Sequence, residues 1–366
     1  MFKPSKLYVD TNAIKYNLDQ IQKDIGKDIE IMPVLKSNAY GIGIESVSGV
    51  IKNYNIVGVA NIAEAMELKK YYKNKIFIMY QPSIEDIPII CDNNFEISVS
   101  NNIEFLKKLN KQANNKIKIH INVETGSGIL GVQLNKLKDF CKNIKELENI
   151  MVNGIFMHYS CSESLEQDDI IFSNNQSEKF QKAIAIAEEE LGKIKYKHAG
   201  CSSATFSQPS TRYNLVRMGL LMYGYGNLPH LTGYIDIKPC LKFTTKILQI
   251  ETFPEGACFG YGRTFKAKSE IKVATIAAGY AEGIHRKMSN NGYVVINGKK
   301  APIIGRVCMN LTMIDITNID GDINCGDEVI IFDNENIKIN EVAKNSETNI
   351  AECMMHIGKT VERVVI

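Results

Sequence analysis

The first two thirds of this 366-residue chain alternate short runs of β-branched residues with longer amphipathic segments. Such alternation is typical of βα units around a parallel sheet, because each crossover helix covers a face of the sheet. We expect eight strands, at residues 31–35, 56–60, 76–80, 95–99, 117–123, 150–158, 194–198 and 213–217. Periodic apolar positions predict helices at 62–73, 103–112, 134–144 and 176–191. The pattern predicts an α/β fold, a TIM-like (β/α)8 barrel.

The pattern changes after Gly226, where strands and glycine-containing turns replace the helices. The expected strands are at 241–252, 271–278, 293–296, 313–317 and 328–332. Turns such as Asn297-Gly298-Lys299 separate these runs, as in hairpins. We therefore expect a barrel domain over 1–232 and a mostly β C-terminal domain over 233–366, joined near residues 227–234.

Charge and cysteine usage exclude several classes of protein. A net charge of +2 with interspersed acidic and basic residues argues against a nucleic-acid or membrane partner. No window approaches the roughly 18 apolar residues of a membrane span, and the N-terminus has no signal-like apolar segment. Nine cysteines without a CxxC pair argue against a metal site and a disulfide framework. We expect a cytoplasmic protein that acts on a small molecule.

A lysine stands where the first expected strand ends. Lys36 follows the apolar run 31–35 and precedes the segment Ser37-Asn38-Ala39-Tyr40-Gly41. Desolvation at the end of a buried strand disfavours the ammonium form, which makes the amine a better nucleophile toward a carbonyl cofactor. The alternative is a strand-end lysine that only reaches for water. Lys36 by itself does not decide between these two interpretations.

Polar groups also stand at the carboxyl ends of later strands, where barrel enzymes place their active sites. These groups are His158 after the sixth strand, Ser202 and Ser203 after the seventh, and Arg217 at the end of the eighth. The backbone amides of Gly219 and Leu220 follow closely and can bind a phosphate. This convergence favours a cofactor site with Lys36 at its centre.

Five ordered motifs carry a resemblance to a known family. They are VLKSNAYG at 34–41, VRMG at 216–219, YGRTF at 261–265, GYAEG at 279–283 and PIIGRVCM at 302–309. Along its whole length the chain resembles the alanine racemase family, pyridoxal-phosphate (PLP) racemases with an N-terminal barrel and a C-terminal β domain. The family's default role is to supply D-alanine for peptidoglycan.

The resemblance implies that Lys36 forms a Schiff base with PLP and also serves as one acid/base group. Tyr261, from the other subunit of a head-to-tail homodimer, matches the base on the opposite face of the substrate. One proton acceptor on each face suffices to invert a stereocentre. The family couples this tyrosine to the histidine matched by His158. Arg217 matches the residue facing the pyridine nitrogen, where a permanent cation keeps that nitrogen unprotonated and disfavours side reactions.

The resemblance also assigns contacts to the cofactor and the substrate. The matched phosphate ligands are Tyr40, Ser202, Gly219 and Leu220, and the matched substrate-side residues of the other subunit are Tyr280 and Met309.

Several positions depart from the family pattern. Ile129 stands where the family has an arginine that positions the substrate carboxylate, and Asn122 stands where many members carry a carbamylated lysine. Loss of both looks like a coupled replacement, since either alone would leave an unpaired buried charge. Whether an anion takes the lysine's place stays open. Ala351 replaces a tyrosine that narrows the substrate pocket.

Two further departures are Asn310 in place of aspartate after Cys308-Met309, and Cys201 in place of asparagine before Ser202. We hypothesise that these changes admit a side chain larger or more polar than methyl, with alanine still possible. The alternatives are a serine racemase, a racemase of lysine, ornithine or arginine, and a PLP-binding regulator. Arg217 argues against a related decarboxylase of basic amino acids, which has an acidic group at the pyridine nitrogen.

Overall fold

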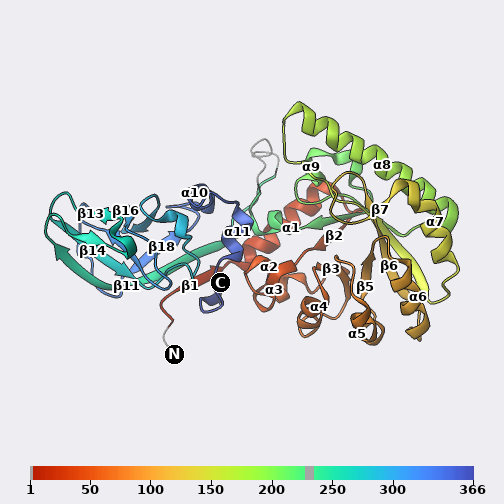
Figure 1. Ribbon diagram of the computed structural model, residues 1–366, viewed down its shortest axis with the longest axis horizontal. Helices are drawn as coiled ribbons and strands as arrows, with labels where there is room; N and C mark the ends of the chain where they lie inside the picture. The colour runs from red at the N-terminus through yellow and green to blue at the C-terminus, as the bar shows by residue number, and fades with distance from the viewer. Residues whose placement is uncertain (1–2, 227–234) are drawn as a thin grey trace. The chain divides into compact units, whose positions relative to one another are not determined.

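The computed structural model describes residues 3–226 and 235–366 of the chain. Two compact units can be distinguished in it (Figure 1). The barrel unit comprises residues 15–39 and 47–237, and the β unit comprises residues 1–14, 40–46 and 238–366. Each unit is described by itself below.

Eight parallel strands form the barrel unit among the described residues, as the sequence predicts. They are β2 (Glu30–Pro33), β3 (Ile56–Val59), β4 (Lys75–Ile78), β5 (Glu96–Val99), β6 (Ile117–Glu124), β8 (Ile150–Phe156), β9 (Tyr196–His198) and β10 (Leu215–Met218). Strands β3 to β9 pair in chain order, and β10 pairs with β2. A parallel bridge between Val34 and Gly58 joins β2 to β3. The Arg217 amide donates to the Gly200 carbonyl (2.9 Å), which links β10 to the end of β9.

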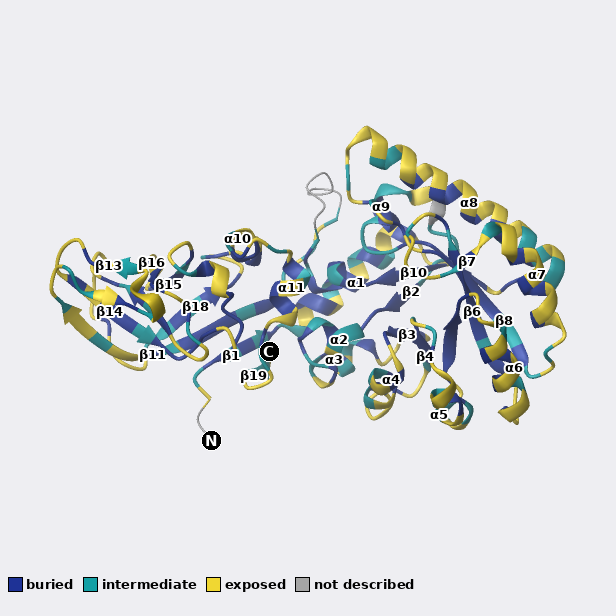
Figure 2. Cartoon of the chain, viewed as in Figure 1, coloured by how far each residue is buried: buried dark blue, intermediate teal, exposed yellow. Residues whose placement is uncertain are grey.

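Helices cover the outside of these strands, with buried strands and exposed outer helix faces (Figure 2). They are α1 (Thr11–Ile25), α3 (Ile44–Ile51), α4 (Ile62–Lys69), α5 (Ile87–Asn93), α6 (Ile103–Gln112), α7 (Leu134–Lys145), α8 (Gln167–Leu191) and α9 (Ala204–Ser207). Helix α8 begins nine residues before the expected 176, because its first turns are mostly polar or exposed and carry no apolar period. Helix α4 ends at Lys69, short of the expected 73.

A cluster of buried side chains from six strands packs in the barrel. Its members are Met32, Ile56, Phe77, Phe156, Tyr196 and Leu215. Burial of a large apolar side chain stabilises a fold by about 1.5–3 kcal/mol. This cluster therefore holds the strands, and with them the strand ends that carry the site, in fixed positions.

The β unit is built on an eight-stranded sheet in the order β14-β17-β16-β15-β18-β11-β1-β19, with β14 also paired to β11. Its strands are β1 (Lys6–Val9), β11 (Leu241–Phe253), β14 (Ile271–Ile276), β15 (Tyr293–Ile296), β16 (Lys299–Ile304), β17 (Thr312–Asp315), β18 (Glu328–Phe332) and β19 (Glu362–Val365). A small hairpin, β12 (Cys258–Phe259) with β13 (Phe265–Lys266), and two short helices, α10 (Ile339–Asn345) and α11 (Ile350–Met355), complete it. The expected mostly β domain is confirmed.

The N-terminal strand does not join the barrel. β1 pairs antiparallel with β11 and parallel with β19, so residues 1–14 group with the β unit, as do residues 40–46. The division differs in this respect from the expected 1–232 and 233–366, because a short alternating strand does not reveal which sheet it will join. The expected junction at 227–234 lies outside the described residues. Within the described part of the chain, no helix combines the length and apolarity needed to cross a membrane.

Candidate active site

Lys36 is the first residue of α2 (Lys36–Tyr40), a helical turn with left-handed backbone geometry. The φ angle lies between 55° and 56° at four successive residues, Ser37, Asn38, Ala39 and Tyr40. This conformation costs about 1–2 kcal/mol per L-residue, and non-glycine residues normally adopt it singly. Backbone strain of this kind persists only where surrounding contacts hold it, and such places are often functional. The turn fixes the direction in which the chain leaves Lys36.

The environment of Lys36 alters its proton affinity. Burial lowers the pKa of its half-buried amine, and the positive charge of Arg217 lowers it further. Glu64 and, to a smaller extent, Cys201 act in the opposite direction and raise the pKa of Lys36. The net result is a larger neutral fraction near neutral pH than an ordinary lysine has, and the neutral amine is the nucleophilic form.

Arg217 lies on β10 and is only 3% exposed. Its guanidinium donates to the carbonyls of Met157 (2.8 Å), His198 (2.8 Å) and Ala199 (3.2 Å). Burial lowers the pKa of Arg217 to about 10, so it remains a cation at neutral pH. These hydrogen bonds hold the guanidinium in a fixed orientation, because most of its N–H groups already donate to carbonyl oxygens.

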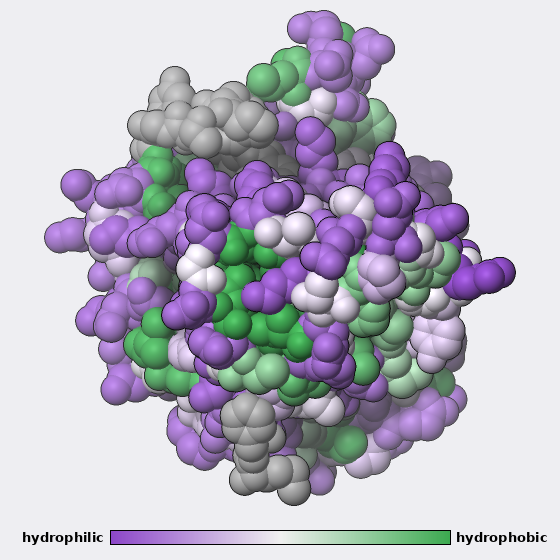
Figure 3. All heavy atoms as spheres, turned by 90° about the vertical axis from the view of Figure 1, so that its left-hand side faces the viewer, coloured by the Kyte–Doolittle hydropathy of each residue, from purple (hydrophilic) through white to green (hydrophobic). Residues whose placement is uncertain are grey.

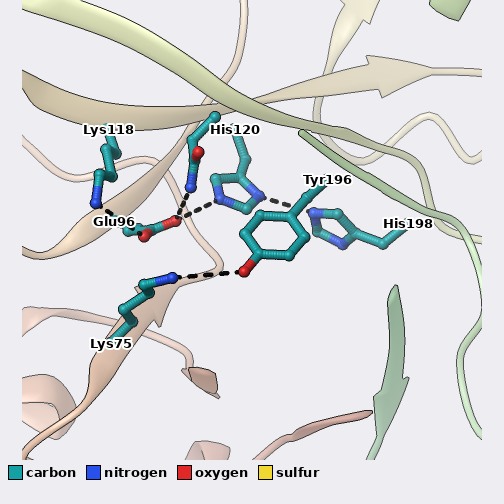
Figure 4. A network of polar contacts seen from close by, with 7 residues as sticks. Lys75, Glu96, Lys118, His120, Tyr196 and His198 are labelled. Atoms are coloured by element: carbon teal, nitrogen blue, oxygen red, sulfur yellow. Dashed lines mark hydrogen bonds and ion pairs between the residues drawn. The ribbon is translucent and has the colours of Figure 1, made fainter. Parts of the chain in front are cut away.

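A series of buried imidazoles continues from Arg217 into the barrel. Figure 4 shows the part of this series formed by His198, His120 and Glu96. Arg217 Nη1 lies 2.9 Å from His198 Nδ1, His198 Nε2 lies 2.8 Å from His120 Nδ1, and His120 Nε2 lies 2.9 Å from Glu96 Oε2. Because a guanidinium only donates, His198 Nδ1 must accept, so its Nε2 carries the proton and donates to His120. His120 then donates to Glu96. One direction of donation therefore runs from Arg217 to the Glu96 carboxylate.

The imidazoles of His198 and His120 are both neutral. Burial and the charge of Arg217 lower the pKa of His198 well below its ordinary value. Burial also lowers the pKa of His120, against the raising effect of Glu96. Glu96 accepts from Asn153 Nδ2 (2.7 Å) and lies 3.9 Å from the Lys118 amine. Burial raises the pKa of its carboxyl, but His120 first of all, and then Asn153 and Lys118, lower that pKa below its ordinary value.

Glu96, His120 and His198 are not among the site residues predicted from the sequence. The available signal was a polar residue at the centre of an expected strand, as at His120 in the run 117–123, where polar and apolar residues alternate. That signal does not show that three such residues on three strands meet at one place in the barrel interior.

Gly154 on β8 leaves the space that the His120 imidazole occupies. A Cβ at position 154 would lie 2.2 Å from His120 Nδ1, a ring that is buried and bonded on both sides. We expect Gly154→Ala to displace the ring and to lower the free energy of unfolding by about 1–3 kcal/mol or more. Urea unfolding monitored by circular dichroism measures this loss.

Gly49→Ala is the matched control for that substitution. Gly49 lies on the exposed side of α3, and a Cβ there would meet no atom within 4 Å. Alanine in a helix should stabilise this variant slightly, by about 0.5–1 kcal/mol. Equal stability of Gly154→Ala and wild type would contradict the tight packing of His120.

His158 follows β8 and accepts a 3.3 Å hydrogen bond from Arg217 Nη2 at its Nδ1. Part of the His158 side chain is exposed to solvent. Desolvation of the ring by the surrounding protein lowers its pKa, and the positive charges of Arg217 and Lys36 lower it further. The neutral ring therefore carries its proton on Nε2, which is left as a donor on the far side from Arg217.

Ser202 lies beside the amides predicted to bind phosphate. Its Oγ accepts from the amides of Gly219 (3.2 Å) and Leu221 (3.4 Å), and Leu220 begins a short 3₁₀ helix, η3 (Leu220–Tyr223). A hydroxyl and clustered backbone amides suit a phosphate group. Cys201 stands where the family usually has asparagine. Its Sγ lies 3.3 Å from Ser203 Oγ.

The segment with Ile129 is a glycine-rich loop between β6 and β7 (Val132–Gln133). The Glu124 carboxylate shapes it by accepting from the amides of Gly126 and Gly128 and from the hydroxyl of Ser127. Ile129 is 76% exposed, whereas Asn122 is buried on β6. An apolar side chain this exposed contributes little to the packing of the barrel.

In the β unit, Tyr261 begins the 3₁₀ helix η4 (Tyr261–Arg263) between β12 and β13, and it is 71% exposed. Tyr280 and Met309 lie on two loops that are joined by backbone hydrogen bonds, from Tyr280 to Cys308 (3.0 Å) and from Ala281 to Met309 (2.9 Å). The structure thus brings these two predicted substrate residues together.

Asn310 takes part in the same pair of loops. Its Nδ2 donates to Glu282 Oε1 (2.8 Å), and Glu282 Oε2 accepts from the Gly279 amide (2.9 Å). An aspartate at 310 would place a second carboxylate against the buried Glu282, and like charges so close are destabilising. The Asn310 side-chain amide is therefore a suitable donor to the Glu282 carboxylate. The sequence departure at position 310 did not by itself predict this pairing.

Tyr40 precedes Gly41, which packs against α11. A Cβ at position 41 would lie 2.4 Å from the Met354 carbonyl, and Arg363 Nη2 donates to the Gly41 carbonyl (2.8 Å). Ala351 is half-buried on the same helix. Within the β unit, the segment with Tyr40 and the helix with Ala351 therefore lie together.

The residues present fit a pyridoxal phosphate group. The barrel unit offers a half-buried amine with a lowered pKa at Lys36, a buried cation at Arg217, and a hydroxyl with adjacent amides at Ser202. Carbonyl, pyridine nitrogen and phosphate each have a chemically suitable partner among them.

Comparison with known proteins agrees with this assignment. Residues 9–227 match the family model "Alanine racemase, N-terminal domain", and residues 240–365 match "Alanine racemase, C-terminal domain". Alanine racemase 1 of Caldanaerobacter subterraneus subsp. tengcongensis is 30% identical, over 99% of this chain and 95% of that protein. The solved alanine racemase of Clostridium difficile 630 has a TM-score of 0.93 at 26% identity, covering 99% of this chain and 96% of that one. That of Bacillus anthracis with bound L-Ala-P has a TM-score of 0.92 at 27% identity, covering 100% and 96%.

The barrel, the β unit and these relatives define an isomerase, a PLP-dependent amino-acid racemase. The chain belongs to the alanine racemase family. Its cofactor is pyridoxal 5′-phosphate.

Proposed function

We propose that this racemase inverts amino acids with two bases, Lys36 and Tyr261 of a second copy of the chain. The observation that carries the proposal is the Lys36 amine, whose pKa is lowered by burial and by Arg217 at the carboxyl end of a barrel strand. When bound, PLP withdraws electrons from the α-carbon of the substrate and so makes its proton removable. Lys36 then takes up or returns that proton on one face.

Tyr261 serves the opposite face. Its 71% exposure leaves the phenol accessible to a second copy of the chain, as a head-to-tail homodimer requires. Met309 (57%) and Leu311 (41%) add exposed apolar surface to the same unit, and Figure 3 shows apolar atoms in a patch among hydrophilic ones on its end. Apolar side chains that are exposed in a monomer are suited to burial in an interface.

His158 and Arg217 tune the two bases. A tyrosine is a weak base at its ordinary pKa of about 10, so a neighbouring donor that stabilises the phenolate is needed. His158, with Nδ1 held by Arg217 and Nε2 protonated, supplies such a donor. Arg217 itself faces the pyridine nitrogen and, because carbonyls and His198 fix it, keeps that nitrogen unprotonated.

Phosphate is held by Tyr40, Ser202 and the amides of Gly219 and Leu220, and the substrate contacts Tyr280 and Met309 of the second copy of the chain. The pocket is wider than in family members that have an arginine at 129 and a tyrosine at 351. Ile129 offers no positive charge to a substrate carboxylate, and Ala351 occupies less space than an aromatic ring. Alanine fits this pocket, and so do serine and longer side chains.

A chiral assay over alanine, serine, lysine, ornithine and arginine tests the function and ranks the substrates. We expect racemisation of alanine and of at least one larger amino acid, with kcat/KM values within about 100-fold of each other, since pocket fit of this kind discriminates by about 10–200-fold. Product enantiomers are measured by chiral chromatography with the PLP-loaded full chain.

Ala351→Tyr is the companion variant in this assay. Restoring the ring should lower kcat/KM for the larger amino acids by about tenfold or more relative to alanine. Turnover of alanine alone by the wild-type chain would refute the widened pocket. Tight PLP binding with no turnover of any of the five amino acids would instead favour a PLP-binding regulator.

A further inference from the structure

Glu64 has no place in the mechanism described so far, yet its carboxylate contacts the segment that follows Lys36. Oε1 accepts from the Ser37 amide (2.6 Å), and Oε2 accepts from the Ala60 amide (2.8 Å). Glu64 lies on α4, and the two amides follow the ends of two neighbouring strands, β2 and β3. One carboxylate therefore ties together the ends of two strands of the barrel.

Local helix capping fixes this carboxylate. Asn61 is the N-cap of α4, and its side chain accepts from the Glu64 amide (3.0 Å). In an ordinary capping box the glutamate returns to the amide of the N-cap residue itself. Here it reaches the preceding residue, Ala60, and its other oxygen goes to the next strand. The contact to Ser37 is thus built into the start of the helix.

The turn at Ser37 needs such a partner. Four consecutive left-handed residues follow Lys36, a conformation that L-residues do not maintain by themselves. The hydrogen bond from the Ala39 amide to the Leu35 carbonyl (2.8 Å) closes the turn at one end. The charged acceptor from Glu64 holds its first amide, and charge-assisted hydrogen bonds are the stronger kind.

We propose that Glu64 is a positioning residue for Lys36: by holding the Ser37 amide it maintains the left-handed turn, and its charge faces the Lys36 amine. The proposal deepens the proposed function and rests on it for the role of Lys36. Three other titratable groups face Lys36, namely Arg217 from β10, Cys201 after β9 and His158 after β8. Glu64 and Cys201 raise the pKa of Lys36, while burial and Arg217 lower it.

Glu64→Gln tests this role, because glutamine keeps the size but loses the charge and one acceptor oxygen. Glu67→Gln is the matched control, on the same helix with a side chain 44% exposed and paired with Lys70. The first measurement needs no cofactor. In the full chain without PLP, we expect the amides of residues 37–41 to exchange hydrogen at least about tenfold faster in Glu64→Gln, and at the wild-type rate in Glu67→Gln.

The second measurement follows covalent PLP uptake by absorbance as a function of pH. In Glu64→Gln the Kd for PLP should rise about tenfold or more, since the amine is less well placed. Its uptake midpoint should move to lower pH, because the loss of a nearby negative charge favours the neutral amine.

The outcomes separate the two proposals. Wild-type exchange rates in Glu64→Gln would overturn the role of Glu64 in the turn. Faster exchange with an unmoved uptake midpoint would overturn its action on Lys36 and leave a purely structural contact. Failure of the wild-type chain to take up PLP would refute the proposed function, and the exchange measurement would still decide the role of Glu64 in the turn.

Discussion

Replacement of Lys36 by alanine should abolish covalent attachment of PLP and lower the rate of racemisation by about 10⁴-fold or more. The side chain serves as the nucleophile toward the cofactor and as the base on one face, so its loss removes two functions together. Mass spectrometry of the borohydride-reduced protein measures attachment, and chiral chromatography measures the rate. Lys107→Ala, an exposed position on α6, is the control and should behave as wild type.

The lowered pKa of Lys36 adds a pH signature to the same experiment. The neutral amine is the reactive form, so the rate of PLP uptake by the wild-type chain should rise with pH. It should level off below the pH of about 10.4 at which an ordinary lysine is half neutral. Added methylamine should restore part of the activity of Lys36→Ala by supplying a free amine. Retained covalent attachment in Lys36→Ala would show that another lysine binds the cofactor.

The barrel could be predicted because its strands are buried on both sides and separated by periodic helices. The eight expected segments correspond to β2, β3, β4, β5, β6, β8, β9 and β10. β1 could not be placed, since its pairing with β11 and β19 depends on contacts more than 200 residues apart in the chain. Short strands carry too little pattern to specify such a partner.

The candidate site could be predicted where a residue type is unusual for its position. Lys36 and Arg217 are charges at the ends of apolar strands, and such placement is costly without a function or a partner. Glu96, His120 and His198 could not be predicted as a group, because only the hydrogen bonds among them connect these residues. Those hydrogen bonds form only when the barrel closes. Glu64 looked like one more charge on a helix face. Its role follows from the left-handed turn, and Ser37 to Tyr40 contain no glycine that would have indicated one.

Tyr261→Phe distinguishes the two-base arrangement from a single base that serves both faces. Removing the hydroxyl leaves Lys36 and the PLP contacts of the barrel unit untouched, so cofactor absorbance should be unchanged. One face of the substrate then has no proton acceptor, and we expect racemisation to fall by about 10²–10⁴-fold, the usual contribution of one acid/base group.

The isotope pattern gives the sharper result. In D₂O, Tyr261→Phe should exchange the α-proton of the enantiomer that faces Lys36 and return the same enantiomer, because the proton leaves and re-enters on one face. The opposite enantiomer should exchange at least about 10²-fold more slowly than with wild type. Tyr293→Phe, a substitution of the same kind on β15 of the same unit, should leave both exchange rates unchanged. Unchanged racemisation by Tyr261→Phe would mean that Lys36, or a solvent-borne proton, reaches both faces.

A mixture of the Lys36→Ala and Tyr261→Phe chains tests whether the two bases come from different copies, since Tyr261 belongs to the β unit and Lys36 to the barrel unit. If each site combines groups from two chains, the mixed dimer has one site with both bases intact, and mixing two inactive variants should restore up to about a quarter of the wild-type activity, the share expected when half of the dimers are mixed and each has one intact site.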